Sequence, residues 1–150
     1  MSLTNVFLIF ALLGSGVCVA LQGPTNSMLA GAVRSPINAA FLSFLVGTLV
    51  LLVVILIQGV RPEWRAMRAL PWYAWMGGVY GAIFVSVVAY AAPRIGIAAT
   101  LTVLIAGQAA TALVLDHFGA FGLPVRPVTL MRALGMAAVV GGVLLVRKTG

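Results

Sequence analysis

The sequence predicts an all-α integral membrane protein with five transmembrane helices, folded as a single membrane domain over residues 1–150. Composition is the first reason: 63% of the residues are hydrophobic and only 7% are charged. A soluble domain carries about 25% charged residues, so this chain could not cover a globule with polar surface. Length is the second reason, because five apolar segments each approach or exceed the roughly 20 helical residues that span a hydrocarbon core.

The first two expected helices cover residues 4–33 and 37–57. The first lacks any Lys or Arg before Arg34, so it is read as a retained helix and not as a cleaved signal. At 1.5 Å per residue it would be about 45 Å long, and Pro24 should kink it because proline removes a backbone hydrogen bond. Pro36 marks the start of the second helix and Gly59 its end.

The remaining expected helices cover residues 72–92, 95–116 and 129–146. The third lies between Pro71 and Pro93 and begins in a cluster of aromatic residues typical of a membrane–water interface. The fourth ends before Gly119, which suits a left-handed helix cap. The fifth follows a stretch rich in glycine and proline and ends at two basic residues.

The net charge of +7 arises from nine Lys and Arg residues against two acidic residues. The basic residues stand singly or in loose groups between apolar runs, as in loops that flank membrane helices. We therefore expect them to meet anionic lipid headgroups and expect no nucleic-acid partner. Cys18 is the one cysteine, so an intramolecular disulfide is excluded.

The basic residues are almost evenly divided between the two sides that five spans would create. Five arginines (61, 65, 68, 126 and 132) fall on the side of the N-terminus, and four basic residues (34, 94, 147 and 148) fall on the other side. Because a Lys/Arg bias sets orientation, this balance indicates either that something else sets the orientation or that the protein inserts in both directions. Two opposed copies would be related as the inverted repeats of many secondary transporters are. A fixed orientation, or pairing with a related chain of opposite orientation, remains an alternative.

Polar side chains inside the apolar segments need a reason, because burying them costs free energy unless they form hydrogen bonds. Gln22 and Asn26 are spaced i, i+4 on one face of the first helix, beside the carbonyl that Pro24 frees. Their depth is close to the bilayer midplane, where transporter sites tend to lie. They either line a substrate site or join helices by amide hydrogen bonds. Gln108 and Tyr90 are further candidates for substrate contact.

Small residues recur every four positions beside these polar groups. Gly23, Ser27 and Gly31 form such a row on the first helix, and Gly77 and Gly81 form another on the third. Rows of this kind usually allow membrane helices to pack closely.

Asp116 and His117 come at the end of the fourth helix, so they should lie at the headgroup boundary. An aspartate there faces the negative end of the helix dipole and needs a compensating group. His117, an arginine such as Arg126 or Arg132, or Arg94 of an opposed partner could serve. The pair is either a structural turn with an ion pair or a gate or proton relay.

Residues that would indicate catalysis are missing from the sequence. No acidic residue lies in the middle of an expected helix, and no phosphate-binding loop, nucleophile–base pair or metal-binding cluster occurs. We therefore expect no enzyme activity, no catalytic residue, no metal site and no cofactor.

Four stretches carry a resemblance to a known family: "LQGPTNSML", "SFLVGTLVLL", "GQAATALVLDHFGAFG" and "GMAAVVGGVLLVRK". Over essentially the whole chain they resemble the YdcZ-like family, small five-helix members of the drug/metabolite transporter (DMT) superfamily. Larger members have ten helices in two inverted halves, so the resemblance implies that two chains complete the transporter. It also implies that six residues occupy the family's recurring polar positions: Gln22, Asn26, Gln108, Asp116, His117 and Gly119.

Small multidrug members of the superfamily use a glutamate in their first helix, which this sequence lacks. That departure argues against proton-coupled cation exchange of their type.

The expected function is transport of a small metabolite or drug-like solute across the inner membrane. Alternating access in an antiparallel dimer is the expected mechanism, with a neutral site formed by Gln22, Asn26, Gln108 and Tyr90 and a gate or ion pair at Asp116 and His117. Neutral groups favour a polar uncharged or zwitterionic solute. The alternative is a non-transporting accessory subunit that packs against another membrane protein.

Overall fold

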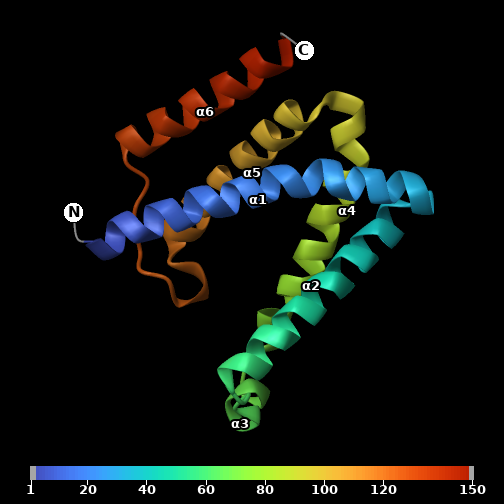
Figure 1. Cartoon of the computed structure of the whole chain (residues 1–150). Helices are drawn as coiled ribbons and strands as arrows, with labels where there is room; N and C mark the ends of the chain where they lie inside the picture. Colours follow the sequence, from blue (N-terminus) through green and yellow to red (C-terminus); the bar gives the residue numbers. More distant parts are fainter. Residues whose placement is uncertain (1–2, 149–150) are drawn as a thin grey trace. The chain divides into compact units, whose positions relative to one another are not determined.

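The computed structural model describes residues 3–148, and every regular element in that range is a helix (Figure 1). The chain divides into two compact units, Met1–Pro93 and Arg94–Gly150, which are described separately. Four segments in the described range are long and apolar enough to cross a membrane. They are Leu3–Val33, Pro36–Gln58, Trp72–Ile95 and Ile97–Phe118, and a shorter apolar helix covers Leu130–Val146. These lengths and compositions identify an integral membrane protein.

The first unit contains two long helices followed by two short ones and most of a third long helix. They are α1 (Leu3–Val33), α2 (Pro36–Gln58), α3 (Trp64–Arg68), the 3₁₀ helix η1 (Trp72–Met76) and α4 (Gly77–Ile95). The connection after α2, expected as a basic loop, therefore contains a helical turn at α3.

The turn between α1 and α2 is built from local backbone and cap interactions. Arg34 adopts a left-handed conformation with φ 54°, and the Ser35 N–H donates to the Ala30 carbonyl at 3.1 Å, which closes α1. The Ser35 hydroxyl then accepts a hydrogen bond from the Asn38 N–H at 3.2 Å, and Pro36 occupies the first turn of α2. α2 ends at Gly59, whose φ of 65° suits glycine.

Both internal prolines lie within continuous helices. α1 runs through Pro24, and α4 runs through Pro93 to Ile95 instead of ending at residue 92. α4 ends only at Gly96, because the φ of 81° at this residue is incompatible with a right-handed helix and is readily adopted by glycine. Pro93 does remove one hydrogen bond, since it has no N–H for the carbonyl of Ala89 four residues earlier.

Small side chains form the core of the first unit. Ala30 of α1, Ala39 of α2 and Ala89 of α4 are buried against one another, with Leu29 and Val33 packed on them. Gly81 of α4 lies close to the ring of Phe44 on α2, because a Cβ at position 81 would be 2.9 Å from Phe44 Cζ. Three helices approach closely here since their contact surfaces carry so little bulk, as is common in membranes.

The outward surface of this unit is apolar. The large hydrophobic side chains of α2 from Leu45 to Ile57 are all exposed. Such a continuous apolar surface does not suit water and indicates contact with lipid or with another membrane-embedded chain.

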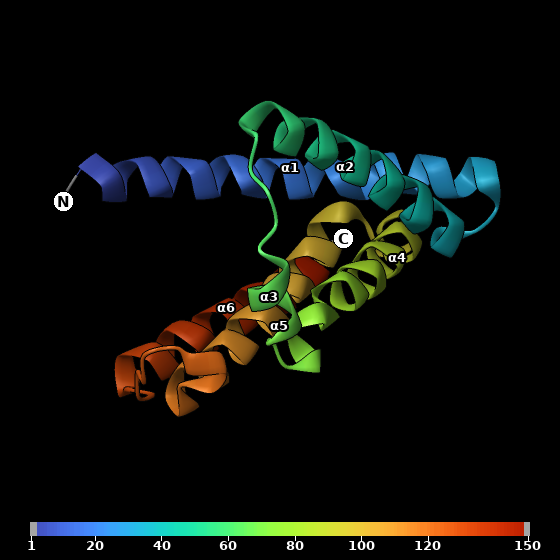
Figure 2. The same cartoon turned by 90° about the horizontal axis from the view of Figure 1, so that it is seen from below.

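The second unit contains α5 (Ile97–Phe118), a 3₁₀ turn η2 (Ala120–Gly122) and α6 (Leu130–Lys148), with α6 packed beside α5 (Figure 2). Thr129 caps α6, because its hydroxyl accepts a hydrogen bond from the Arg132 N–H at 3.3 Å. α5 ends at Gly119, with φ 59°.

Candidate functional site

The polar pair of the first helix lies where α1 is buried. Asn26 is 5% exposed and Gln22 is half-buried, one turn apart on α1. Gly23 and Ala30 are buried on the same side of the helix, whereas Gly31 is exposed. The row of small residues that faces the core of the first unit therefore contains Gly23 and Ala30, with Asn26 between them.

The amide of Asn26 forms no hydrogen bond with another residue of the described chain. Among the described residues, no side-chain nitrogen or oxygen is both fully enclosed and without a hydrogen-bond partner. Since the amide of Asn26 has no such partner, its atoms are not fully enclosed by the protein. A buried amide costs free energy until it forms hydrogen bonds, so this position is suited to a water or a small ligand.

Neighbouring hydroxyls on α1 already have partners. Thr25 donates to the carbonyls of its own helix, Leu21 at 3.0 Å and Gln22 at 3.1 Å. Ser27 lies 2.9 Å from the Gly23 carbonyl and 3.1 Å from the Ala89 carbonyl on α4. Both hydroxyls are thus already bonded to backbone carbonyls, and the two amides are the groups that remain for a ligand.

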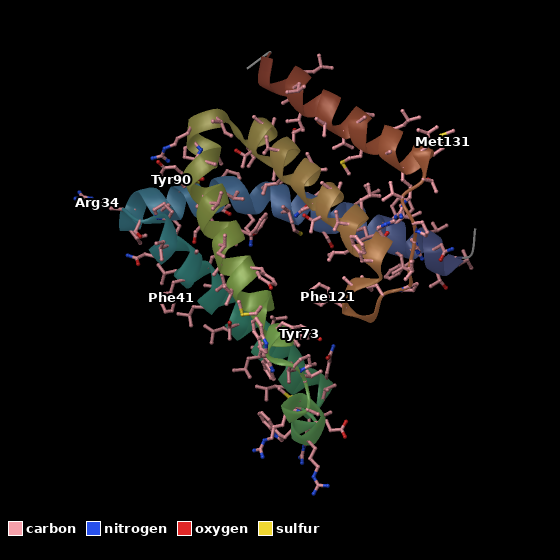
Figure 3. All side chains as sticks on the ribbon, turned by 180° about the vertical axis from the view of Figure 1, so that it is seen from behind. Arg34, Phe41, Tyr73, Tyr90, Phe121 and Met131 are labelled. Atoms are coloured by element: carbon pink, nitrogen blue, oxygen red, sulfur yellow. The ribbon has the colours of Figure 1, made fainter. Side chains whose placement is uncertain are left out.

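Tyr90 follows Ala89 on α4 and is 52% exposed (Figure 3). Its neighbour Ala89 binds Ser27, which lies next to Asn26 in sequence. The structure thus joins the helix turns that carry Asn26 and Tyr90.

Gln108 lies near the middle of α5 in the second unit, where its side chain is exposed. Its amide forms no hydrogen bond with another described residue. An exposed amide in an apolar span is unfavourable against lipid, so the Gln108 face of α5 requires a polar neighbour or a water-filled path.

Asp116 and His117 hold the connection between α5 and α6, residues 119–129. The carboxylate of Asp116 pairs with the guanidinium of Arg132, on the first turn of α6. The Asp116 carbonyl accepts the Arg126 N–H at 2.7 Å, and Arg132 Nη1 donates to the Arg126 carbonyl at 2.9 Å. Arg132 is thus the group that compensates the aspartate against the helix dipole.

The imidazole of His117 holds the same connection from the other side. The backbone N–H of Val128 donates to His117 Nδ1 at 3.3 Å, and the ring packs edge-on against Phe118 with centroids 4.8 Å apart. Gly119 allows the chain to reverse, because a Cβ there would lie 2.9 Å from the Leu123 carbonyl oxygen. Asp116 and His117 therefore hold the same eleven-residue segment through separate hydrogen bonds.

Two hydrogen-bond partners near the candidate site residues were not singled out by the sequence pattern. The interhelical hydrogen bond of Ser27 was missed, although Pro93 signals a carbonyl that lacks a donor. Val128 was missed because its contribution is a backbone N–H, which no side-chain pattern reveals. In the described residues, no group of three or more His, Cys, Asp or Glu could hold a metal ion.

Comparison with known proteins places the chain in a family. Residues 6–145 match a family described as "Putative inner membrane exporter, YdcZ". The chain is also 30% identical over 150 residues to the inner membrane protein YdcZ of Escherichia coli strain K12, covering 99% of this chain and 97% of that protein. No solved structure matches the chain. With its apolar helices, this match makes the chain a multi-pass inner membrane protein that belongs to the YdcZ family.

Proposed function

We propose that this protein is an inner membrane transporter that exports a small metabolite or drug-like solute by alternating access. Two chains in opposite orientations form the working unit, and α6 supplies the fifth span of each. The family's description as an exporter supports the transport direction. Transport, rather than catalysis, also fits the chemistry of the described polar groups, which are mostly amides and hydroxyls.

The observation that carries the proposal is the amide of Asn26. Asn26 is only 5% exposed, and its amide has no hydrogen-bond partner in the described chain. The amide atoms are nevertheless not fully enclosed, so a small molecule can reach them. With Gln22 one turn away, Asn26 offers two donors and two acceptors per amide to a solute. Tyr90 and Gln108 are proposed as further polar contacts for a solute.

The absence of charge around Asn26 on α1 sets the proposed class of solute. The residues from Gln22 to Ser27 are neutral, so the site gains nothing from a net charge on the solute. A polar uncharged or zwitterionic solute is favoured, because an ion would lose its hydration without a counter-charge.

Two features support a working unit of two chains in opposite orientations. The Lys/Arg residues are divided five to four between the two sides of a five-span chain. Gln108 is exposed on an apolar span, where a second chain would supply the polar contact that lipid cannot.

Flux measurements with matched variants test the site. In everted inner-membrane vesicles from cells that overproduce the protein, uptake of a panel of labelled neutral and zwitterionic solutes is measured. Gln22→Leu with Asn26→Leu should abolish the flux and leave the assembly intact on size-exclusion chromatography. Thr25→Val is the matched control, because Thr25 bonds only to its own helix; it should transport normally. Flux that persists in the double variant would remove Gln22 and Asn26 from the site.

Cysteine accessibility tests the arrangement of the pair. Single cysteines introduced at residues 3 and 146 in a Cys18→Ala background are labelled with an impermeant maleimide from each side of the membrane. Labelling of both positions from both sides is expected. A single orientation with no opposed partner chain would contradict the antiparallel pair, and a stable complex with another membrane protein without flux would favour an accessory subunit.

A further inference from the structure

The hydrogen bond between Val128 and His117 depends on the protonation state of the ring. The donor is a backbone N–H, and the acceptor is Nδ1 of the imidazole at 3.3 Å. Nδ1 accepts a hydrogen bond only when it carries no proton, so this hydrogen bond requires the neutral ring whose one proton lies on Nε2.

A proton that binds this ring occupies the same lone pair. It moves from water to Nδ1, and the ring then presents N–H groups on both nitrogens. The Val128 N–H would face another N–H, so the hydrogen bond is lost. Protonation of Nδ1 and the hydrogen bond from Val128 therefore exclude each other. Since His117 is exposed, water can deliver the proton directly.

The charged groups of this part of the second unit lie on both helices and on the connection between them. Within the second unit these are Asp116 on α5, Arg126 in the α5–α6 connection and Arg132 on α6. The carboxylate is already engaged with Arg132.

We propose that His117 is a proton-binding site whose occupancy releases the α5–α6 connection, and that the proton is thereby the ion that gates transport. The proposed gating of transport by the proton rests on the proposed transport function, whereas the proposed release of the connection does not. Because protonation of Nδ1 and the hydrogen bond from Val128 exclude each other, a step that releases the connection leaves Nδ1 open to a proton. The site lies at the end of a span, distinct in position and residue type from a glutamate within the first helix.

Nuclear magnetic resonance of the ring tests the protonation state without any substitution. His117 is the single histidine of the chain, so ¹⁵N-histidine labelling of the full-length protein in nanodiscs reports one ring. At pH 8 the expected spectrum has an unprotonated Nδ1 and a protonated Nε2. The opposite tautomer would overturn the proposal.

Spin-label mobility tests the release. A nitroxide is attached at Leu123→Cys, an exposed position of the connection, in the Cys18→Ala background. Between pH 8 and pH 5 the mobile fraction of the wild-type connection should rise roughly five-fold, as expected for the loss of one hydrogen bond.

Two substitutions at His117 separate the proton from other effects. His117→Asn keeps an acceptor close to the place of Nδ1 and cannot titrate in this range, so its connection should stay ordered at both pH values. His117→Phe keeps an aromatic ring beside Phe118 and has no acceptor, so its connection should be mobile at both. A wild-type label that does not respond to pH, or an Asn variant that responds like the wild type, would overturn the proposal.

The two proposals fail in different ways. If the solute panel shows no flux but the label responds to pH through His117, the transport function fails and the proton site stands. If flux is present and the label is insensitive to pH, the transport function stands and the proton site fails.

Discussion

The Ser27 hydroxyl on α1 lies 3.1 Å from the Ala89 carbonyl on α4, and Ala89 stands four residues before Pro93. In a helix that carbonyl would accept the N–H of residue 93, which proline lacks. The serine of one helix thus offers the hydrogen bond that the proline of another removes. This contact lies beside Ala30 and Ala39 in the small-residue core of the first unit, and it holds α4 against the turn of α1 that carries Asn26.

Replacing Ser27 with alanine should destabilise the protein by about 1 kcal/mol, because the Ala89 carbonyl loses its donor in an apolar environment. Denaturation in mixed detergent micelles, followed by circular dichroism, measures this change. Ser15→Ala is the control, since the Ser15 hydroxyl binds only the Ala11 carbonyl of its own helix at 2.9 Å. Equal effects of the two substitutions would show that the interhelical bond contributes nothing.

Gly119→Ala should disturb the end of α5. A side chain at this φ of 59° costs roughly 1–2 kcal/mol, and its Cβ would lie 2.7 Å from Val125 Cγ2 and 2.9 Å from the Leu123 carbonyl oxygen. A lowered Tm in detergent is expected. Gly107→Ala on the same helix meets nothing within 4 Å and should leave Tm unchanged or raise it. A Tm for Gly119→Ala at or above the wild-type value would rule out the left-handed turn.

The ion pair of Asp116 and Arg132 should contribute a coupling free energy of roughly 0.5–1 kcal/mol. The side chains are 29% and 34% exposed, so water and salt weaken the attraction. A double-mutant cycle with Asp116→Asn and Arg132→Gln measures the coupling, which should fall at high salt. Arg126→Gln removes the same charge but keeps the backbone contacts of residue 126, and it should show no coupling with Asp116→Asn.

Arg34→Gly should stabilise the turn between α1 and α2 by about 0.5–1 kcal/mol. Arg34 has φ 54°, a conformation that costs an L-residue more than it costs glycine. Arg34→Ala removes the same charge and keeps the strain, so it should not stabilise. Thermal unfolding of the three proteins in the same detergent decides between strain and charge as the cause, and equal Tm values for the Gly and Ala variants would exclude strain.

Local signals account for most of the helix ends. Pro36 starts α2 and Gly59 ends it, Gly119 ends α5, and Thr129 caps α6, all as residue type and position indicate. Pro93 shows the limit of such signals. It lies near the end of α4, where few helical bonds remain to be lost, and a side chain from α1 supplies a donor to the carbonyl it leaves unpaired.

The sequence likewise reveals one part of the candidate site and not the other. An amide pair at Gln22 and Asn26, spaced one turn apart in an apolar segment, is visible in the sequence because both residue types are costly there. The sequence does not reveal that Asn26 is buried while Gln108 is exposed, because burial depends on which helix faces pack together.

Apolar length, composition and helix-breaking residues were enough to identify a membrane protein and its apolar helices, since these properties act within about 20 consecutive residues. They also marked Asp116 and His117 as the polar end of a span. Packing between helices settled which partners those two residues have. Arg132 and Val128 lie 16 and 11 residues away in sequence, and they reach Asp116 and His117 only because Gly119 turns the chain and α6 returns along α5. A contact of that kind depends on the path of the backbone, and no residue pattern near Asp116 encodes it.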